Sequence, residues 1–473
     1  MRQRLKRLLS SLLLCAVLAG SLAVPASAAR FTDVPAGHWA ADSIARCVEL
    51  KFFQGEPTRA TYPDVPVDAW YAGAIEAAYA NGAITDQNDA FRPGDPITRE
   101  ELAVMLVRAL GYGTIAGMAQ ELPMPFRDVQ TNVGYITMAY DLGLVGGTTA
   151  DTFSPEKTAT REQVAVILMR LYDKLHAAAP GKVAIIASAE GLGDLTGFEA
   201  VAVSAGRLIS SGGSKVNATM KAEDAAAAQD SVRKAGAKAL LYVEGGPTAL
   251  NGTPAEAAAV LAEAVQSGGY DGLFLDIAKL KDDKELALTK LVQTLKPLLR
   301  DRLLYLAVEA PAWQGAKYLG YRYETLGKYV DRMVLRVASH ERVSKDFPTS
   351  PIEPLEELYY ALGEMQGKVD AAKLSLLLTT TGTVWTDGKK DGSVSGAEIA
   401  AALAGKDTED YYSSRYACAY LSGKTGDGKS LVIWYLNMQS AAERMQLLRC
   451  FGVDQVCLTD LQSASPDLLM GLR

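Results

Sequence analysis

The 473-residue sequence has few of the residues on which zinc sites, disulfide frameworks and histidine-based catalysis depend. It contains three histidines and five cysteines. The cysteines show no Cys-x-x-Cys or Cys/His spacing of the kind that holds zinc, and they are too few for a disulfide framework in so long a chain. We therefore predict no histidine-based triad, no metal site and no cofactor.

Surplus positive charge and long apolar segments are also missing. The formal net charge is −7, and phosphate binding requires a basic surface, so nucleic acid is not a predicted partner. After the first thirty residues no apolar run reaches the length needed to cross a membrane, so no transmembrane segment is predicted there. With 49% hydrophobic and 22% charged residues, the remainder should form ordinary globular domains.

The N-terminus has the pattern of an export signal. Four basic residues precede residue 8, an apolar run covers 8–22, and Ala26-Ser27-Ala28 is a small-x-small cleavage site. The alternative, a membrane anchor that is retained, is disfavoured because the run is short and this site follows it. We predict that residues 1–28 are a signal peptide and that the protein is secreted.

Residues 30–175 contain an internal repeat. An aromatic-x-Asp-Val opening recurs at Phe31, Tyr62 and Phe126, followed each time by a helical pattern. Two units continue into a Phe-x-Pro turn and a Thr-Arg-Glu helix start, within 91–101 and 153–163. The first unit lacks this second half. The region should be an all-α domain of two and a half units.

This combination of motifs resembles S-layer homology modules, and the resemblance covers residues 31–172. It implies a protein at the cell surface, associated with the S-layer and attached to the cell wall. The implied partners are secondary cell-wall polysaccharides, acidic and often pyruvylated, and the peptidoglycan that carries them. The resemblance also makes Trp39, which the first unit retains, a candidate glycan-binding residue.

The two Thr-Arg-Glu motifs have a structural and a functional interpretation. Residues 98–101 and 160–163 should be capping boxes that begin helices. Capping does not explain Arg99 and Arg161, because the helix dipole disfavours a cation at this end. Each arginine should bind an anion, which is either a ligand carboxylate or a repeat acid. We favour the ligand, since guanidinium suits bidentate carboxylate recognition. The alternative repeat acids are Asp64 and Asp128.

Residues 176–181, which include Pro180-Gly181, have the composition of a linker. From residue 182 to 473 apolar runs alternate with amphipathic helical patterns, which indicates a parallel sheet. Eight runs fit a (β/α)8 TIM barrel, typically about 250 residues long. A doubly wound open sheet is the alternative, but no glycine-rich nucleotide motif follows the first run. The predicted strands are Val183–Ser188, Ala200–Ser204, Ala239–Val243, Gly272–Ile277, Leu303–Val308, Met333–Val337, Leu374–Thr379 and Gln455–Thr459.

The fourth run, residues 270–278, resembles the signature strand of glycoside hydrolase family 18, Asp-Gly-x-Asp-x-Asp-x-Glu. Asp271 and Asp276 match its first and last Asp, whereas Phe274 replaces the middle Asp and Ala278 replaces the proton-donating Glu. Segments near the seventh strand and the last helix are most similar to cell-wall and spore-cortex hydrolases of that family. The resemblance implies a barrel with a degenerate catalytic motif.

Strand alternation should turn Asp276 and position 278 towards the barrel axis, but Ala278 cannot donate a proton. The sixth strand has Arg336 in place of the family's Met-x-Tyr-Asp opening. Glu244 and Glu309, which end the third and fifth strands, are candidates for a relocated acid or for ion partners of Arg336. We favour ion pairing, because an unpaired buried arginine is costly. We predict that Arg336 binds Asp276.

Three further features have two interpretations each. Trp313 and Trp385 are either platforms for sugar rings or core residues. The segment 387–398 has acids at its first, fifth and twelfth positions, a spacing that suggests a calcium loop. The alternative, which we favour, is a surface turn with a helix cap. These acids are Asp387, Asp391 and Glu398.

We therefore predict a secreted cell-surface protein whose barrel binds glycan or is structural and has lost hydrolase activity. The first alternative is an active hydrolase of peptidoglycan or N-acetylglucosamine polymers that uses a relocated acid. The second is a barrel whose mouth binds a small molecule or peptide.

Overall fold

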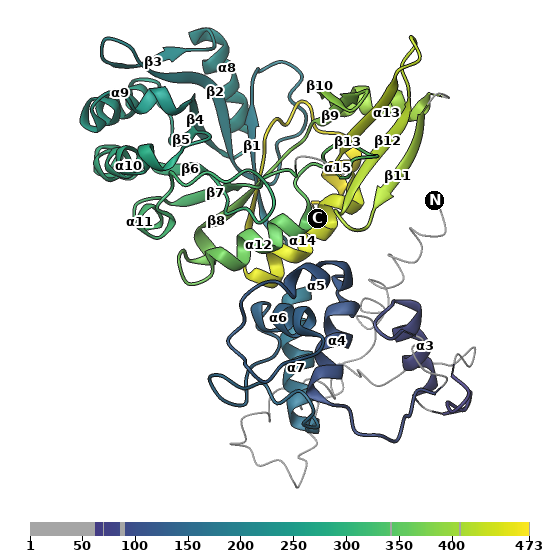
Figure 1. Ribbon diagram of the computed structural model, residues 1–473. Coiled ribbons are helices and arrows are strands. Elements are labelled where there is room, and N and C mark those ends of the chain that lie inside the picture. Colours follow the sequence, from purple (N-terminus) through teal and green to yellow (C-terminus); the bar gives the residue numbers. More distant parts are fainter. Residues whose placement is uncertain (1–61, 70, 86–89, 341–342, 406–407, 473) are drawn as a thin grey trace, which may run out of the picture. The chain divides into compact units, whose positions relative to one another are not determined.

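A computed structural model describes residues 62–69, 71–85, 90–340, 343–405 and 408–472 (Figure 1). The predicted signal peptide, the first repeat unit and Trp39 lie outside these residues. The chain divides into two compact units, Met1–His176 and Ala177–Arg473, which are described separately. No helix in the described part is both long enough and apolar enough to cross a membrane.

The first unit is all-α in its described part, as predicted. The helices that begin at Arg99 and Arg161 each start with a capping box. In each box the threonine hydroxyl accepts a hydrogen bond from the N–H group three residues later. The helices are α3 (Ala72–Ala80), α4 (Arg99–Ala109), α5 (Gly113–Ala119), α6 (Val133–Asp141) and α7 (Arg161–Leu175).

The repeat motif forms the same turn in both described units. The carboxylate of Asp128 accepts hydrogen bonds from the N–H groups of Phe153 and Ser154, at 2.7 Å each. Asp64 makes the same two bonds to 91–92, at 2.8 and 2.7 Å. The second residue of each turn is left-handed, with φ of 58° and 59°. The repeated spacing between the acid and the turn is therefore explained by the backbone. The carboxylate stabilises a left-handed conformation that would otherwise be unfavourable.

The second unit is the predicted (β/α)8 barrel. Its parallel strands are ordered β1-β14-β8-β7-β6-β5-β4-β2, and pairing of β1 with β2 closes the ring, which excludes the open sheet. The short strand β3 (Ser214–Ala218) extends β2 in the antiparallel direction. The barrel strands are β1 (Gly181–Ile186), β2 (Phe198–Ser210), β4 (Lys238–Gly245), β5 (Gly272–Ile277), β6 (Leu303–Glu309), β7 (Arg332–Arg336), β8 (Leu374–Leu378) and β14 (Gln455–Leu458).

Apolar side chains from alternate positions fill the barrel interior, with Phe274 of β5 at 0% exposure among them. Gly272 enters β5 where a Cβ atom would collide with Leu303 of β6, so only glycine allows this close strand contact. The barrel helices are α8 (Ala222–Lys234), α9 (Pro254–Ser267), α10 (Glu285–Leu299), α11 (Tyr323–Gly327), α12 (Leu355–Met365), α14 (Met438–Phe451) and α15 (Pro466–Met470), with short 3-10 turns η1 (Pro247–Leu250), η2 (Asp282–Lys284) and η3 (Ala371–Lys373).

A second sheet, which the sequence analysis did not predict, is inserted between β8 and α14 (Figure 1). It is antiparallel, with the order β10-β9-β13-β12-β11. One face packs on Ile399 of α13 through Leu421 and Ile433. Its elements are β9 (Gly382–Thr386), β10 (Lys389–Val394), α13 (Gly396–Ala404), β11 (Thr408–Ser413), β12 (Cys418–Lys424) and β13 (Ser430–Tyr435).

The candidate calcium loop spans the β9–β10 turn, β10 and the start of α13. Asp387 lies in the β9–β10 turn and accepts the Ser430 N–H group at 3.0 Å, while Asp391 accepts the Thr386 hydroxyl at 2.9 Å. Glu398 closes the capping box of α13. The three acids thus serve separate local bonds, and the described residues contain no cluster of three or more metal-ligating side chains. These bonds agree with the favoured interpretation, a turn followed by a helix cap.

Candidate functional site

The carboxyl ends of the barrel strands hold a buried ionic network centred on Asp276. This side chain points inward from β5, and one of its oxygens accepts hydrogen bonds from the Tyr242 hydroxyl at 2.6 Å and the Arg336 guanidinium at 2.5 Å. The other oxygen is buried without a hydrogen-bond partner among the described residues. The predicted ion pair between Asp276 and Arg336 is therefore present.

Arg336 binds a second acid as well. Its other terminal nitrogen lies 3.1 Å from a Glu309 oxygen, which also accepts the Lys279 N–H group at 3.1 Å. Burial alone would lower the pKa of Arg336, but the carboxylates of Asp276 and Glu309 outweigh it and raise that pKa. One guanidinium thus forms ion pairs with two buried carboxylates.

Tyrosines complete the polar packing of the barrel mouth. The Tyr321 hydroxyl donates to the Ile277 carbonyl at 3.0 Å, and the Tyr323 hydroxyl donates to the Glu309 carbonyl at 2.8 Å. Burial raises the pKa of both tyrosines, so they remain neutral donors. These bonds fix the ends of β5 and β6, where the network lies.

The other sequence-predicted acids are not part of this network. Glu244 is the β4 residue in register with Asp276, but its carboxylate pairs with Arg207, with 2.7 Å between Nε and the carboxylate. Asp271 is at the opposite end of β5, where it accepts the Ala239 N–H group at 2.8 Å and joins β4 to β5. Ala278 immediately follows β5, and its N–H group donates to the Gly245 carbonyl at 3.2 Å. Of the candidate acids, only Asp276 and Glu309 are brought together.

Glu353 is an acid near the mouth that the sequence analysis missed. It is 4% exposed, and one oxygen accepts hydrogen bonds from the N–H and hydroxyl groups of Thr379 at the end of β8. Its other oxygen is buried without a hydrogen-bond partner among the described residues, and its backbone is left-handed, with φ of 43°. Burial raises the pKa of Glu353 to about 7. The flanking Pro351 and Pro354 form no motif that would have revealed it.

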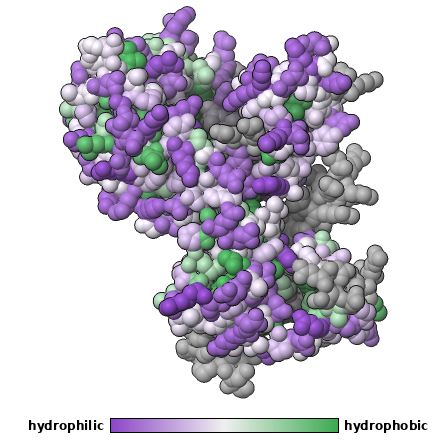
Figure 2. All heavy atoms as spheres, viewed as in Figure 1, coloured by the Kyte–Doolittle hydropathy of each residue, from purple (hydrophilic) through white to green (hydrophobic). Residues whose placement is uncertain are grey.

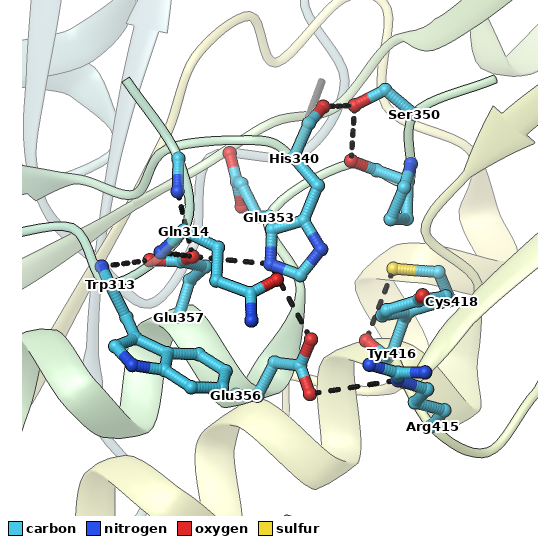
Figure 3. Close-up of polar contacts among 12 residues, drawn as sticks. Trp313, Gln314, His340, Ser350, Glu353, Glu356, Glu357, Arg415, Tyr416 and Cys418 are labelled. Carbon is cyan, nitrogen blue, oxygen red and sulfur yellow. Dashed lines mark hydrogen bonds and ion pairs between the residues drawn. The ribbon is translucent and has the colours of Figure 1, made fainter. Parts of the chain in front are cut away.

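A second buried polar cluster lies at the start of α12 (Figure 3). The imidazole Nε2 of His340 is 3.1 Å from a Glu357 oxygen and 3.4 Å from a Glu356 oxygen. Burial opposes ionisation of Glu357, but hydrogen bonds from His340 and from backbone N–H groups outweigh it and lower the pKa of Glu357. Burial raises the pKa of Glu356. Both acids therefore lie close to the same histidine nitrogen.

The two predicted barrel tryptophans lie on separate elements. Trp313, in the segment after β6, donates its backbone N–H group to Glu357 at 2.8 Å, and its side chain is half-buried (Figure 3). Trp385 lies in β9 of the inserted sheet, and its ring N–H group is buried without a hydrogen-bond partner among the described residues. No ring contact joins them within the described chain, so they do not form one aromatic surface.

The surface of the second unit has other hollows away from this network. One, of about 440 Å³, lies between α9 and α10 beside Leu298, and another, of about 310 Å³, lies at the opposite end of the barrel beside Lys238 and Arg332. Figure 2 shows a mainly hydrophilic face on which a few hydrophobic side chains lie over α9 and α10. Neither hollow contains a sequence-predicted site residue.

The two arginines of the repeat differ in their surroundings. Arg99 is 8% exposed and donates to the carbonyls of Phe153 at 2.9 Å and Gly146 at 2.5 Å, with its guanidinium 4.5 Å from the centre of the Phe153 ring. Burial lowers the pKa of Arg99, although the nearby Asp128 opposes this effect. Arg161 begins α7 and is exposed. Asp64 and Asp128, the alternative to a ligand carboxylate, bond to backbone N–H groups and form no direct hydrogen bond with either arginine in the described part of the chain.

Comparison with known proteins accounts for the repeat. Residues 30–59, 61–103 and 125–165 match the family model of the S-layer homology domain. The first third of the chain contains S-layer homology domains. Similar proteins include Exoglucanase XynX of Acetivibrio thermocellus, 32% identical over 140 residues (28% of this chain, 13% of the relative). The S-layer protein of Bacillus thuringiensis subsp. finitimus is 29% identical over 198 residues (35% and 24%).

These matches cover less than a quarter of either relative's length. The S-layer homology domains, together with the surface-layer relative, indicate a location at the cell surface.

Solved structures confirm the fold of the second unit. The chitinase from Chromobacterium violaceum aligns with a TM-score of 0.52 at 17% identity, covering 62% of this chain and 99% of that chain. The Bacillus cereus spore cortex-lytic enzyme SleL aligns with a TM-score of 0.52 at 13% identity, covering 80% and 84%. At such identities the similarity establishes a common barrel fold.

Proposed function

We propose that the S-layer homology domains attach this protein to cell-wall polysaccharide and that its barrel binds glycan without hydrolysing it. The observation that carries the second part is the arrangement around Arg336. The position of the family's proton donor holds Ala278, and Arg336 neutralises Asp276 and Glu309 nearby. Of the candidate acids from the sequence analysis, Asp276 and Glu309 are paired with Arg336, and Glu244 is paired with Arg207.

The energetic argument follows from general acid catalysis. A positioned acid contributes about 10²–10⁴-fold to such a reaction. Asp276 and Glu309 are buried and accept hydrogen bonds from Arg336, so neither carboxyl group is presented to a glycosidic oxygen. The resemblance to family 18 also implies catalysis by the substrate's acetamido group, and Phe274 and Arg336 replace groups of that pattern.

An active hydrolase that uses a relocated acid is the second candidate, and Glu353 is the residue that favours it. With a pKa of about 7 it is partly protonated at neutral pH, as a general acid requires. Its strained backbone and unbonded oxygen are features often found at functional sites. Against this role, the side chain is 4% exposed, so a glycosidic oxygen could reach it only after the surrounding segment moved.

We expect the full-length protein to release no reducing ends from purified peptidoglycan or chitin oligomers. Ala278→Glu should remain inactive, because the groups that would orient the acetamido nucleophile are still replaced. Glu353→Gln is the matched variant. Release of reducing ends by the wild type that disappears in Glu353→Gln would refute the non-hydrolytic proposal and establish the relocated-acid alternative.

We expect the full-length protein to sediment with cell-wall sacculi that retain their secondary polymers, and Arg161→Ala to weaken this binding. Arg161 is exposed, so its loss should leave the unfolding temperature unchanged. Arg99→Ala, by contrast, should both weaken binding and lower the unfolding temperature, because the buried carbonyls of Phe153 and Gly146 would lose their donor.

The matched control is Arg127→Ala, which removes an exposed arginine paired with Asp151. It should leave sedimentation unchanged. Undiminished binding by the Arg99→Ala, Arg161→Ala double variant would exclude these arginines from polysaccharide recognition.

A further inference from the structure

The backbone directly after β5 is held in a strained conformation at Lys279. Its φ is 60°, in the left-handed region that residues other than glycine rarely adopt. The Lys279 N–H group donates to Glu309 at 3.1 Å. The next residue, Leu280, donates its N–H group to the Tyr321 hydroxyl at 3.4 Å, and its carbonyl accepts the Gly320 N–H group at 3.0 Å. Strain that is fixed from several sides in this way is typical of functional sites.

Lys279 adds an exposed cation to the barrel mouth. It follows Ala278, the position of the family's proton donor, and its exposed side chain forms no ion pair within the described part of the chain. The Arg336 guanidinium has five N–H groups, and its two hydrogen bonds to carboxylates leave others available. The Arg336 side chain is 27% exposed, whereas those of Asp276 and Glu309 are 7% and 9% exposed. The two cations are therefore more exposed to solvent than the two acids beside them.

We propose that the barrel selects glycans that carry carboxylate groups, and that Lys279 together with Arg336 recognises the carboxylate. This inference rests on the proposed glycan binding and names the class of glycan. An ammonium group is a compact point charge with three donors, and a guanidinium group presents further N–H groups to an anion. A neutral N-acetylglucosamine chain has no group that uses these charges. The carboxylate could belong to the lactyl group of muramic acid or to a uronic acid, and its chemistry is the same in both.

The test measures calorimetric binding of three hexasaccharides to the full-length protein. The neutral probe is an N-acetylglucosamine hexamer. One anionic probe is a peptide-free peptidoglycan fragment with free lactyl carboxylates, and the other alternates N-acetylglucosamine with glucuronic acid. We expect at least one anionic probe to bind about three- to tenfold more tightly than the neutral one, the range of a partly exposed charge-assisted contact. The tighter anionic probe identifies the source of the carboxylate.

Salt provides a second measurement on the same probes. Raising the ionic strength from about 0.05 M to about 0.5 M shortens the distance over which exposed charges interact. The advantage of the anionic probe should therefore largely disappear, while the affinity for the neutral hexamer should stay the same.

Four variants separate recognition from structural support. Lys279→Ala should lose the preference for the anionic probe, and Lys279→Arg should keep it. Lys279→Gly should also lose the preference but should raise the unfolding temperature, because glycine adopts the left-handed conformation without strain. The matched control is Lys234→Ala, which removes an exposed lysine at the end of α8, before β4 begins. It should bind all three probes as the wild type does.

The variants, rather than the wild type alone, assign the preference to the barrel, because the S-layer homology domains are also proposed to bind polysaccharide. Equal affinity of the wild type for all three probes, or a preference that persists in Lys279→Ala, would overturn this inference and leave glycan binding in place. If the protein bound none of the probes, the proposed glycan binding and this inference would both be refuted.

Discussion

Replacing Arg336 with methionine is expected to destabilise the barrel by about 3–5 kcal/mol, the cost typical of breaking a buried ion pair from one side. Asp276 and Glu309 would remain as buried carboxylates without a cation, and their side chains are only 7% and 9% exposed. The triple variant Arg336→Met, Asp276→Asn, Glu309→Gln should recover most of the loss, because no unpaired charge remains. Denaturant unfolding of each variant measures these differences.

The matched control is the ion pair between Arg207 and Glu244 on the neighbouring strands β2 and β4. Its side chains are 59% and 41% exposed, so Arg207→Met should cost no more than about 1 kcal/mol. Equal losses in Arg336→Met and Arg207→Met would show that the barrel mouth is well solvated. The model of a buried ion-pair network in the barrel mouth would then fail.

The sequence predicted the barrel well because strand burial leaves a direct pattern. All eight barrel strands overlap the apolar runs between residues 183 and 459, since parallel strands covered on both faces must be apolar. The pairing of Asp276 with Arg336 followed from strand alternation and from the cost of an unpaired buried charge. Both inferences need only local periodicity and one energetic rule.

The inserted sheet had no such pattern. Residues 389–393 of β10 are all exposed, and they include lysine, aspartate, glycine and serine, which are residues of turns as much as of strands. A strand of this composition is defined by the partner to which it pairs, here β9, rather than by its own residues. The sequence therefore indicated a loop with a possible ion site where the chain forms a hairpin.

The contacts of Arg99 and Glu353 could not be predicted for a different reason. Arg99 binds the carbonyls of Phe153 and Gly146, and carbonyl acceptors carry no side-chain signal in a sequence. Glu353 is buried because its segment returns to Thr379 at the end of β8. Contacts of this kind depend on the path of a loop, which neither composition nor spacing specifies.

The stability of the barrel unit is expected to fall as pH rises from about 5 to about 8, with Glu353 as a principal cause. Its pKa rises from an ordinary value of 4.5 to about 7 on folding, so the folded state binds the proton more tightly. The resulting stability is fully present below the lower value and is lost as pH rises through the higher one. This shift in the pKa of Glu353 corresponds to at most about 3 kcal/mol of unfolding free energy. Glu356, whose pKa is also raised, contributes in the same direction.

Glu353→Gln tests this assignment, because the amide imitates the protonated acid and can still accept from Thr379 through its oxygen. Unfolding free energies measured from about pH 5 to about pH 8 should decline less steeply in this variant, which should be the more stable protein at the alkaline end. Glu324→Gln, which alters an exposed acid paired with Lys328, should leave the slope unchanged. If Glu353→Gln retained the wild-type slope, the carboxyl group would be ionised throughout this range. A charged Glu353 would then need compensation from Arg444, whose fully buried guanidinium already donates to the Glu353 carbonyl.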